Sequence, residues 1–126
     1  MRKSELKIKL SELAFQVTQN AATEPPFTGE FFDFFEDGVY KCICCDAKLF
    51  SSKHKFNSST GWPSFHSCIN DKVIDEVDDN TFGMRRVEII CSNCKAHLGH
   101  VFDDGPKPTF KRYCVNSVAL SFVKND

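Results

Sequence analysis

The chain has 126 residues, of which 41% are hydrophobic and 13% aromatic, and its formal net charge at pH 7 is −1. This length and composition predict a single globular domain over residues 1–126 and exclude a disordered chain. The near-zero charge gives no field that would attract a phosphate backbone or anionic lipid, and no apolar run could span a bilayer, so we expect no nucleic-acid or membrane partner.

The first residues mix both charges and contain no apolar segment, so we predict no signal peptide and expect a cytoplasmic location. Apolar residues then recur at roughly helical spacing from Leu6 to Val17, which predicts one short amphipathic helix over residues 4–19. Ser11, with Ala14 three positions later, does not form a capping box, so no second helix start is predicted there.

A proline-containing segment and a run of phenylalanines follow the predicted helix. Pro25 and Pro26 cannot continue it, so residues 21–30 should lie extended over the surface. We expect the phenylalanines to fill the core from a loop or 3₁₀ segment, and a ligand-facing role for one of them is the alternative. This cluster comprises Phe31, Phe32, Phe34 and Phe35.

From Gly38 onward, short strand-like segments alternate with turn residues, and no long helical pattern separates them. This arrangement predicts an antiparallel, mostly β domain. The acidic run over residues 75–79 is interpreted as a solvated strand end. The predicted strands are residues 39–43, 48–51, 72–77, 84–90, 111–115 and 119–123.

Four of the seven cysteines form two pairs at C-x2-C spacing, Cys42 with Cys45 and Cys91 with Cys94. Four thiolates suit a closed tetrahedral Zn²⁺ site, so the pairs predict one structural zinc ion that does no chemistry. A thioredoxin-type redox motif is the alternative, but it requires a βαβ context that the sequence lacks. Cys44 does not fit the spacing and is expected to be a neighbour of the metal.

Cys114 lies between Arg112 and Asn116 on a predicted strand, so the three side chains should share one face. A nearby cation favours the thiolate, so we predict a reactive Cys114 whose pKa is lowered by Arg112. The alternative is an inert core thiol, since free cysteines are often buried.

Two histidines and the single tryptophan leave alternatives open. His97 and His100 could act as general acids near neutral pH, as metal ligands or as structural residues. Trp62, in the segment 61–65, could form an apolar wall for a small substrate group or fill the core.

Taken together, these residues resemble the B-type methionine sulfoxide reductases, which act on the R epimer of the sulfoxide. Each segment alone is weak evidence, whereas their conjunction is specific and covers nearly the whole chain. The segments that carry the resemblance are residues 24–29, 38–42, 45–50, 56–65, 83–86, 97–102, 104–106 and 112–117.

The resemblance implies two packed antiparallel sheets (a β-tent) with a short N-terminal helix and a structural zinc knuckle pair. Cys114 would attack the sulfoxide sulfur and become a sulfenic acid, in a thiol-dependent repair of oxidised proteins and peptides. Apart from the resemblance, we expect a monomer. By the same resemblance, His97, His100 and Asp104 would orient or supply the proton that the sulfoxide oxygen receives. Arg112 would stabilise the thiolate of Cys114, and Asn116 would help position the substrate. Trp62 and Phe65 would form the wall of the substrate pocket.

The chain also departs from the family pattern. Many members have a resolving cysteine at the position of Thr60, whose hydroxyl cannot form a disulfide. The sulfenic acid must then be reduced by Cys68, by Cys44, or directly by an external thioredoxin-like or small-thiol reductant. Cys68 is the better internal candidate because it follows the Trp62 segment closely. Phe110 replaces a common glycine ahead of the catalytic strand.

Two other function classes remain as alternatives. The zinc knuckles could display a β surface that binds a protein, in which case Cys114 should have no lowered pKa. A zinc hydrolase or deaminase would need His97 or His100 as a ligand and an open coordination position, and the H-x-E signature of deaminases is absent.

Overall fold

The computed structural model describes residues 2–125, with the exception of the side chain of Phe82. Helices α1 (Lys3–Lys9) and α2 (Glu12–Asn20) open the chain, so the prediction of one helix over residues 4–19 is wrong. The break lies at Leu10, which is extended, and at Ser11, whose side-chain oxygen accepts the N–H of Ala14 at 3.1 Å. A serine hydroxyl alone therefore caps α2, without the glutamate of a capping box.

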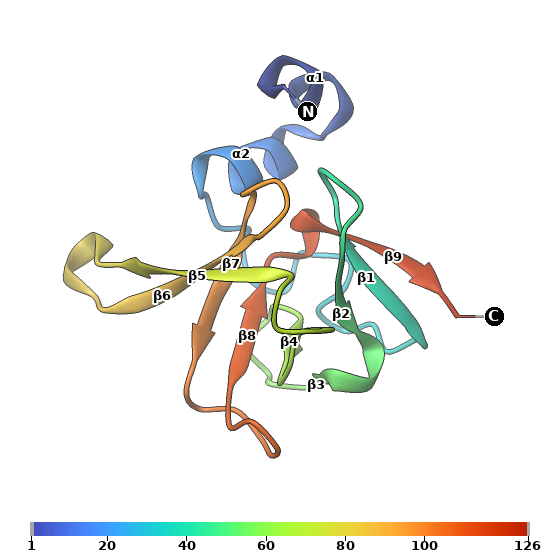
Figure 1. Cartoon of the computed structure of the whole chain (residues 1–126), viewed down its shortest axis with the longest axis vertical. Coiled ribbons are helices and arrows are strands. Elements are labelled where there is room, and N and C mark those ends of the chain that lie inside the picture. The colour runs from blue at the N-terminus through green and yellow to red at the C-terminus, as the bar shows by residue number, and fades with distance from the viewer. Residues whose placement is uncertain (1, 126) are drawn as a thin grey trace.

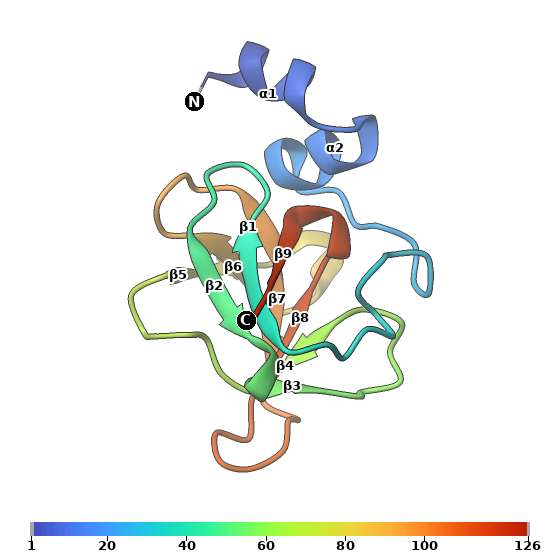
Figure 2. The same cartoon turned by 90° about the vertical axis from the view of Figure 1, so that its right-hand side faces the viewer.

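The rest of the described chain forms two antiparallel sheets, which confirms the predicted mostly β class. The smaller sheet has the order β2-β1-β9 and the larger has the order β3-β4-β8-β7-β6-β5. The smaller sheet lies in front of the larger one in Figure 2, with both helices beyond one end. The strands are β1 (Gly38–Cys42), β2 (Lys48–Ser51), β3 (Lys55–Phe56), β4 (Ser64–Phe65), β5 (Ile74–Asp79), β6 (Arg86–Cys91), β7 (His97–Phe102), β8 (Arg112–Val115) and β9 (Leu120–Lys124).

Strands β3, β4 and β7 lie where no strand is predicted, and β5 is shifted from its predicted position. Strand β5 is the outer strand of the larger sheet (Figure 1). It can include the whole acidic run 75–79 because half of its side chains are exposed to water. No strand is predicted at β7, because it is buried on both faces and contains Gly99 and two histidines. It therefore shows neither the polar–apolar alternation nor the β-branched run of a recognisable strand.

Aromatic side chains fill the space between the sheets. Tyr40, Phe50 and Phe65 are fully buried, and Phe50 stacks on Phe65 with ring centroids 4.4 Å apart. From the predicted loop cluster, Phe31 is buried against Tyr40, whereas Phe35 is exposed. The cluster therefore fills the core only in part. None of the helices within residues 2–125 is long and apolar enough to cross a membrane.

Candidate active site

The centre of the larger sheet brings Cys114 beside a histidine. Cys114 on β8 is the cross-strand partner of His100 on β7 and of Ser64 on β4. Opposite residues on antiparallel strands point to the same face. The two strands come close together because Gly99 has no side chain: a Cβ there would lie 2.0 Å from the carbonyl oxygen of Cys114.

A cavity of about 240 Å³ opens on this face. It brings together Arg112, Cys114, Asn116, His100 and Trp62, five of the residues singled out from the sequence. Asn116 lies just beyond the end of β8, yet it still contributes to the lining. The other lining residues are Thr23, Thr60, Arg86, Gly99, Phe102 and Val115.

The ionisation of Cys114 differs from the sequence prediction. Burial raises the pKa of this thiol to about 11 and outweighs the lowering by Arg112 and by a hydrogen bond with Thr60. The predicted lowering is therefore wrong for the free protein, because sequence spacing reveals the cation but not the desolvation. The pKa of Cys114 therefore does not separate an enzyme from a protein-binding domain. At this pKa the thiol of Cys114 is protonated at neutral pH, so a base has to take its proton if Cys114 is to act as a nucleophile.

This ionisation has a direct test in the pH dependence of Cys114 alkylation. Because the pKa lies near 11, the rate of carbamidomethylation should rise roughly tenfold per pH unit between pH 8 and pH 10, without a plateau. Arg112→Ala removes a cause that lowers the pKa, so the same rate at pH 8 should fall further. Site-resolved mass spectrometry gives both rates, and a plateau below pH 8.5 would contradict this assignment.

Arg112 is fixed in place by Asp104. Its Nε donates to Asp104 Oδ1 at 2.9 Å and its second nitrogen donates to Oδ2 at 3.1 Å, while the guanidinium lies 4.4 Å from the centre of the Phe102 ring. This bidentate pair lowers the pKa of Asp104. Asp104 does not line the cavity, so it acts through Arg112.

His97 lies beside His100 but does not line the cavity. A register shift between Ile89 and Ile90 pairs Ile90 with His97 and leaves Leu98 without a partner. The shift turns His97 to the same side as His100, and the two rings have centroids 5.6 Å apart. His97 Nδ1 contacts Glu88 Oε2 at 2.6 Å, and burial lowers the pKa of His97. The ring is therefore a buried neighbour of His100.

His100 is held by a carboxylate that the sequence did not indicate. Its Nε2 lies 2.8 Å from Oδ2 of Asp79, the last residue of β5. The hydrogen bonds of Asp79 with Thr81 and His100 lower the pKa of Asp79, so this carboxyl is ionised at neutral pH.

Glu24 is another functional residue that sequence reasoning missed. Its backbone N–H donates to Asn116 Oδ1 at 3.0 Å, and its carbonyl accepts the indole N–H of Trp62 at 3.0 Å. Asn116 in turn donates to the carbonyl of Leu98, which leaves one amide N–H for a ligand. Glu24 therefore orients both Trp62 and Asn116. These backbone contacts join residues far apart in the chain, so no local pattern predicts them.

Three other candidate residues lie outside the cavity. Phe65 is fully buried against Phe50 and cannot touch a substrate. Cys68 interacts with the side chain of Tyr113, which points to the opposite face of β8 from Cys114. Cys44 is buried beside the first cysteine pair and accepts a hydrogen bond from Gln19. The structure therefore brings neither thiol to Cys114.

Phe110 also stays away from the cavity. It lies exposed in the loop between β7 and β8, with a left-handed φ of 61°. This conformation explains why a glycine suits the position.

The four paired cysteines form a candidate metal centre. All four sulfurs lie within 4.8 Å of one another, and Cys42–Cys94 and Cys45–Cys91 have Sγ–Sγ distances of 3.6 Å. A tetrahedral zinc ion with Zn–S bonds of about 2.3 Å requires sulfurs about 3.8 Å apart, so the donor set fits. The four cysteines are free of disulfides, and neither His97 nor His100 belongs to the cluster, which argues against an open hydrolytic site.

The two halves of this centre repeat the same turn. The N–H of Cys42 donates to Ala47, and the N–H of Cys91 donates to Ala96. Within the turns, Asp46 and Lys95 have left-handed φ values of 64° and 67°. One turn joins β1 to β2 and the other joins β6 to β7, so a bound ion would connect the two sheets.

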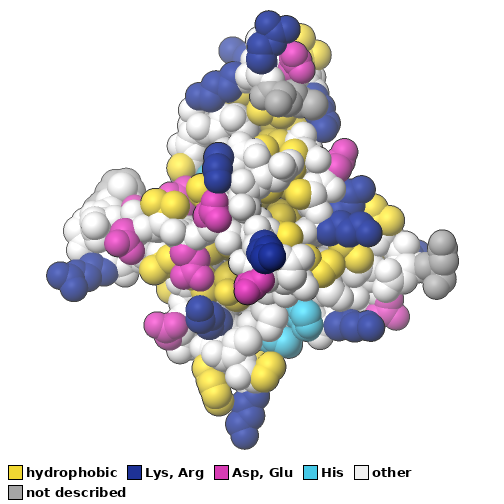
Figure 3. Space-filling model, in the orientation of Figure 1, with side chains coloured by type: hydrophobic (Ala, Val, Ile, Leu, Met, Phe, Trp, Pro, Cys, Tyr) yellow, Lys and Arg dark blue, Asp and Glu magenta, His cyan; other side chains and the backbone are white. Residues whose placement is uncertain are grey.

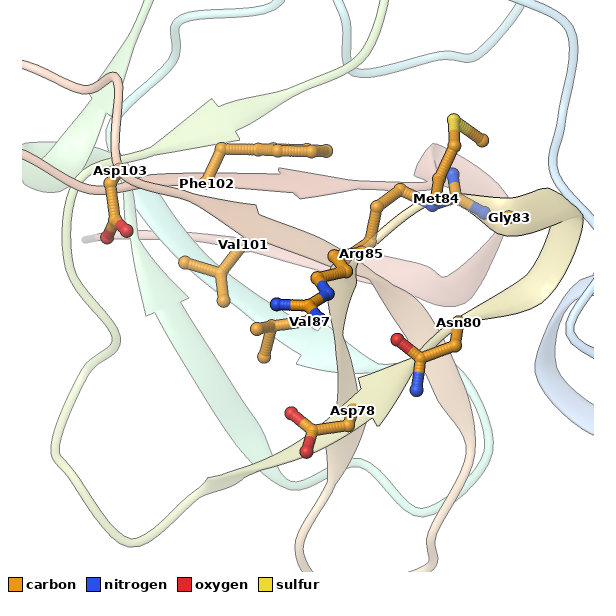
Figure 4. A pocket seen from close by; sticks show the side chains of 10 residues that line it. Asp78, Asn80, Gly83, Met84, Arg85, Val87, Val101, Phe102 and Asp103 are labelled. Atoms are coloured by element: carbon orange, nitrogen blue, oxygen red, sulfur yellow. The ribbon is translucent and has the colours of Figure 1, made fainter.

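A larger hollow of about 750 Å³ lies along β5, β6 and β7 (Figure 4). It shares Arg86 and Phe102 with the smaller cavity and extends to the opposite face of the larger sheet. Its lining includes the cross-strand neighbours Asp78, Val87 and Val101, and it contains neither a cysteine nor a histidine. On the face of the molecule seen in Figure 3, positive and negative side chains are interspersed, without the basic stripe that nucleic acid requires. The smaller cavity is therefore the candidate active site.

Two comparisons with known proteins find sequences similar to this chain. The model of the SelR domain matches residues 10–124 of the chain. A protein of Escherichia coli O139:H28 (strain E24377A / ETEC), described as peptide methionine sulfoxide reductase MsrB, is 54% identical over 122 residues. The match covers 97% of this chain and 89% of that protein.

Proposed function

Because this chain belongs to the SelR domain family, we propose that it is a reductase of methionine-R-sulfoxide in proteins and peptides, with one catalytic domain over residues 1–126. The observation that carries the proposal is the cavity that Cys114 shares with Arg112, His100, Asn116 and Trp62. Repair of oxidised proteins follows, because methionine sulfoxide is a common and reversible oxidative lesion. The test is an assay with each epimer: the R epimer should be reduced and the S epimer should not, and turnover of neither would overturn the proposal.

The proposed reaction transfers the sulfoxide oxygen to Cys114. The sulfur of Cys114 attacks the sulfoxide sulfur, the thiol proton ends on the transferred oxygen, and methionine leaves while Cys114 becomes a sulfenic acid. The cysteine sulfur is oxidised by two electrons and the sulfoxide sulfur is reduced by two. Two molecules of an external thiol then return Cys114 to the thiol and release one disulfide and one water.

The cavity residues divide this work between them. Arg112 stabilises the negative charge that develops on Cys114, and the free amide N–H of Asn116 positions the sulfoxide oxygen. The indole of Trp62 provides an apolar wall for the ε-methyl group. Asp104 keeps Arg112 oriented, and His97 supports His100, which moves the proton.

The metal implied by the four-cysteine cluster is Zn²⁺, held by Cys42, Cys45, Cys91 and Cys94. A zinc ion with four thiolate ligands has no open position, so its role is to stabilise the fold. The site lies on the turns between strands, and the cavity residues do the chemistry.

An external thiol, either small or on a thioredoxin-like protein, is the proposed reductant, because neither Cys68 nor Cys44 faces Cys114. Cys68→Ser should therefore leave the steady-state rate with a dithiol donor unchanged within about twofold. Stopped-flow measurement of the first turnover and of recycling separates the two steps. A slower recycling step in this variant would assign the resolving role to Cys68.

Thr60→Cys provides the matched positive control for this experiment. Thr60 and Cys114 line the same cavity, and Thr60 is close enough to lower the pKa of Cys114, so a thiol at this position lies beside the sulfenic acid. A count of free thiols after one equivalent of substrate should show an intramolecular disulfide in Thr60→Cys and none in the unmodified protein.

A further inference from the structure

The distal end of β5 reaches His100 of the active site through one side chain, that of Asp79. Asp79 pairs with Arg86 across β5 and β6, and Arg86 lines the cavity. Its side chain passes over β6 to reach His100 on β7, and only 15% of it is exposed. The arm formed by β5 and β6, which extends to one side in Figure 1, therefore contributes to the cavity without a reactive group of its own.

The two oxygens of Asp79 have different partners. Oδ1 accepts the backbone N–H of Thr81 at 3.0 Å and its hydroxyl at 2.7 Å, which holds the turn after β5. Oδ2 contacts His100 Nε2 at 2.8 Å and a guanidinium nitrogen of Arg86 at 3.4 Å. One oxygen therefore fixes the local turn and the other faces the histidine.

This arrangement determines which nitrogen of His100 carries the proton. An ionised carboxylate only accepts hydrogen bonds, so His100 Nε2 must be the donor. Among the residues that the structure describes, no hydrogen-bond partner of Nδ1 is found, and His100 lines the cavity. Nδ1 therefore keeps its lone pair and is the nitrogen available to a molecule in the cavity.

We propose that Asp79 is a positioning residue for the reductase reaction: it holds His100 in the tautomer with the proton on Nε2, so that Nδ1 takes the proton of Cys114 and passes it to the sulfoxide oxygen. This inference rests on the function proposed above. Cys114 is the cross-strand partner of His100, which places the proton donor and the ring side by side. During transfer the ring is an imidazolium, and the carboxylate of Asp79 stabilises this charge.

The role of Asp79 has a physical parallel in catalytic triads, where an aspartate fixes the tautomer and orientation of a histidine and stabilises its charged form. The other charged and titratable groups that face His100 do not replace it. The carboxylate of Glu88 contacts His97 instead. Arg86 is positively charged, so it cannot stabilise an imidazolium. The groups facing His100 are Asp79 from β5, Arg86 and Glu88 from β6, His97 from β7, and Arg112 and Cys114 from β8.

Asp79→Asn tests the proposal with little change in shape. The amide oxygen can keep both contacts with Thr81, so the amide nitrogen takes the place of Oδ2 and presents a donor to His100 Nε2. The ring is then expected to move its proton to Nδ1 and lose its ability to accept the proton of Cys114. We expect kcat to fall about 100-fold with KM changed by less than about threefold, which is within the range of general acid–base catalysis.

Asp78→Asn is the matched control. Asp78 is the neighbouring acid on the same strand, but it lines the hollow on the opposite face of the sheet (Figure 4). The substitution removes the same charge from the same arm, so a general electrostatic or structural effect of the arm would appear in both variants. We expect Asp78→Asn to keep kcat within about twofold.

Nitrogen-15 NMR of the metal-loaded protein reads the tautomer of His100 without substrate, and the chain contains only four histidines. The expected result is a proton on Nε2 in the unmodified protein and a shift of this proton to Nδ1 in Asp79→Asn. A proton on Nδ1 of the unmodified protein, or an Asp79→Asn variant with kcat within twofold, would overturn the proposal. Absence of methionine-R-sulfoxide turnover in the unmodified protein would instead overturn the proposed function, because the tautomer is measured independently.

Discussion

Cys114→Ser is expected to lower the turnover of methionine-R-sulfoxide by about 10³-fold or more. A serine hydroxyl is almost never ionised at neutral pH and is a far weaker nucleophile towards sulfur than a thiol. Its oxygen also cannot accept the sulfoxide oxygen as a stable acid. The loss should therefore appear in the first turnover as well as in the steady state, as measured by chromatography of the methionine product.

Cys68→Ser is the control for this substitution. It makes the same change in another partly buried thiol, on the opposite face of β8. Both variants should bind as much metal as the unmodified protein, because neither cysteine belongs to the four-sulfur cluster. A Cys114→Ser variant that retains a tenth of the activity would refute the assignment of the nucleophile.

Loss of the metal centre is expected to have the largest effect on stability. Cys42 and Cys91 are fully buried and belong to different sheets, so the ion would connect two parts of a small β domain. Structural zinc sites contribute on the order of 10 kcal/mol to folding, so Cys91→Ser should lower the free energy of unfolding by about 5 kcal/mol or more. Chemical denaturation and metal analysis of the purified protein measure both quantities.

Cys44→Ser provides the matched control for the metal centre. Cys44 is buried in the same turn as Cys42 and Cys45, but it lies outside the cluster. We expect this variant to keep one metal ion per chain and to lose only about 1 kcal/mol of stability. If Cys91→Ser bound one metal ion with unchanged stability, the four-cysteine site would be wrong.

The sequence was most informative where function depends on local spacing. Two C-x2-C pairs predicted the cluster, and the alternation of Arg112, Cys114 and Asn116 predicted three residues of one cavity. Both predictions rely on geometry that the backbone fixes within a few residues. A turn brings two cysteines together, and a strand places alternate side chains on one face.

The sequence was least informative where burial or contacts between distant residues determine the pKa or the position of a site residue. The pKa of Cys114 depends on desolvation by residues from several strands, which no spacing reveals. Asp79 lies 21 residues from His100, and Glu24 lies 92 residues from Asn116. Phe65 follows Trp62 closely, yet it points into the core because it alternates along β4 with Ser64, which is the cross-strand partner of Cys114. The positions of such residues in the site can be recognised only once the pairing of the strands is known.

Mass spectrometry of Cys114 after one equivalent of methionine-R-sulfoxide, with dimedone present and no reductant, tests the central chemistry most directly. The prediction is one dimedone adduct on Cys114, formed from its sulfenic acid, with Cys68 and Cys44 unmodified. Release of methionine while Cys114 remains an unmodified thiol would contradict it.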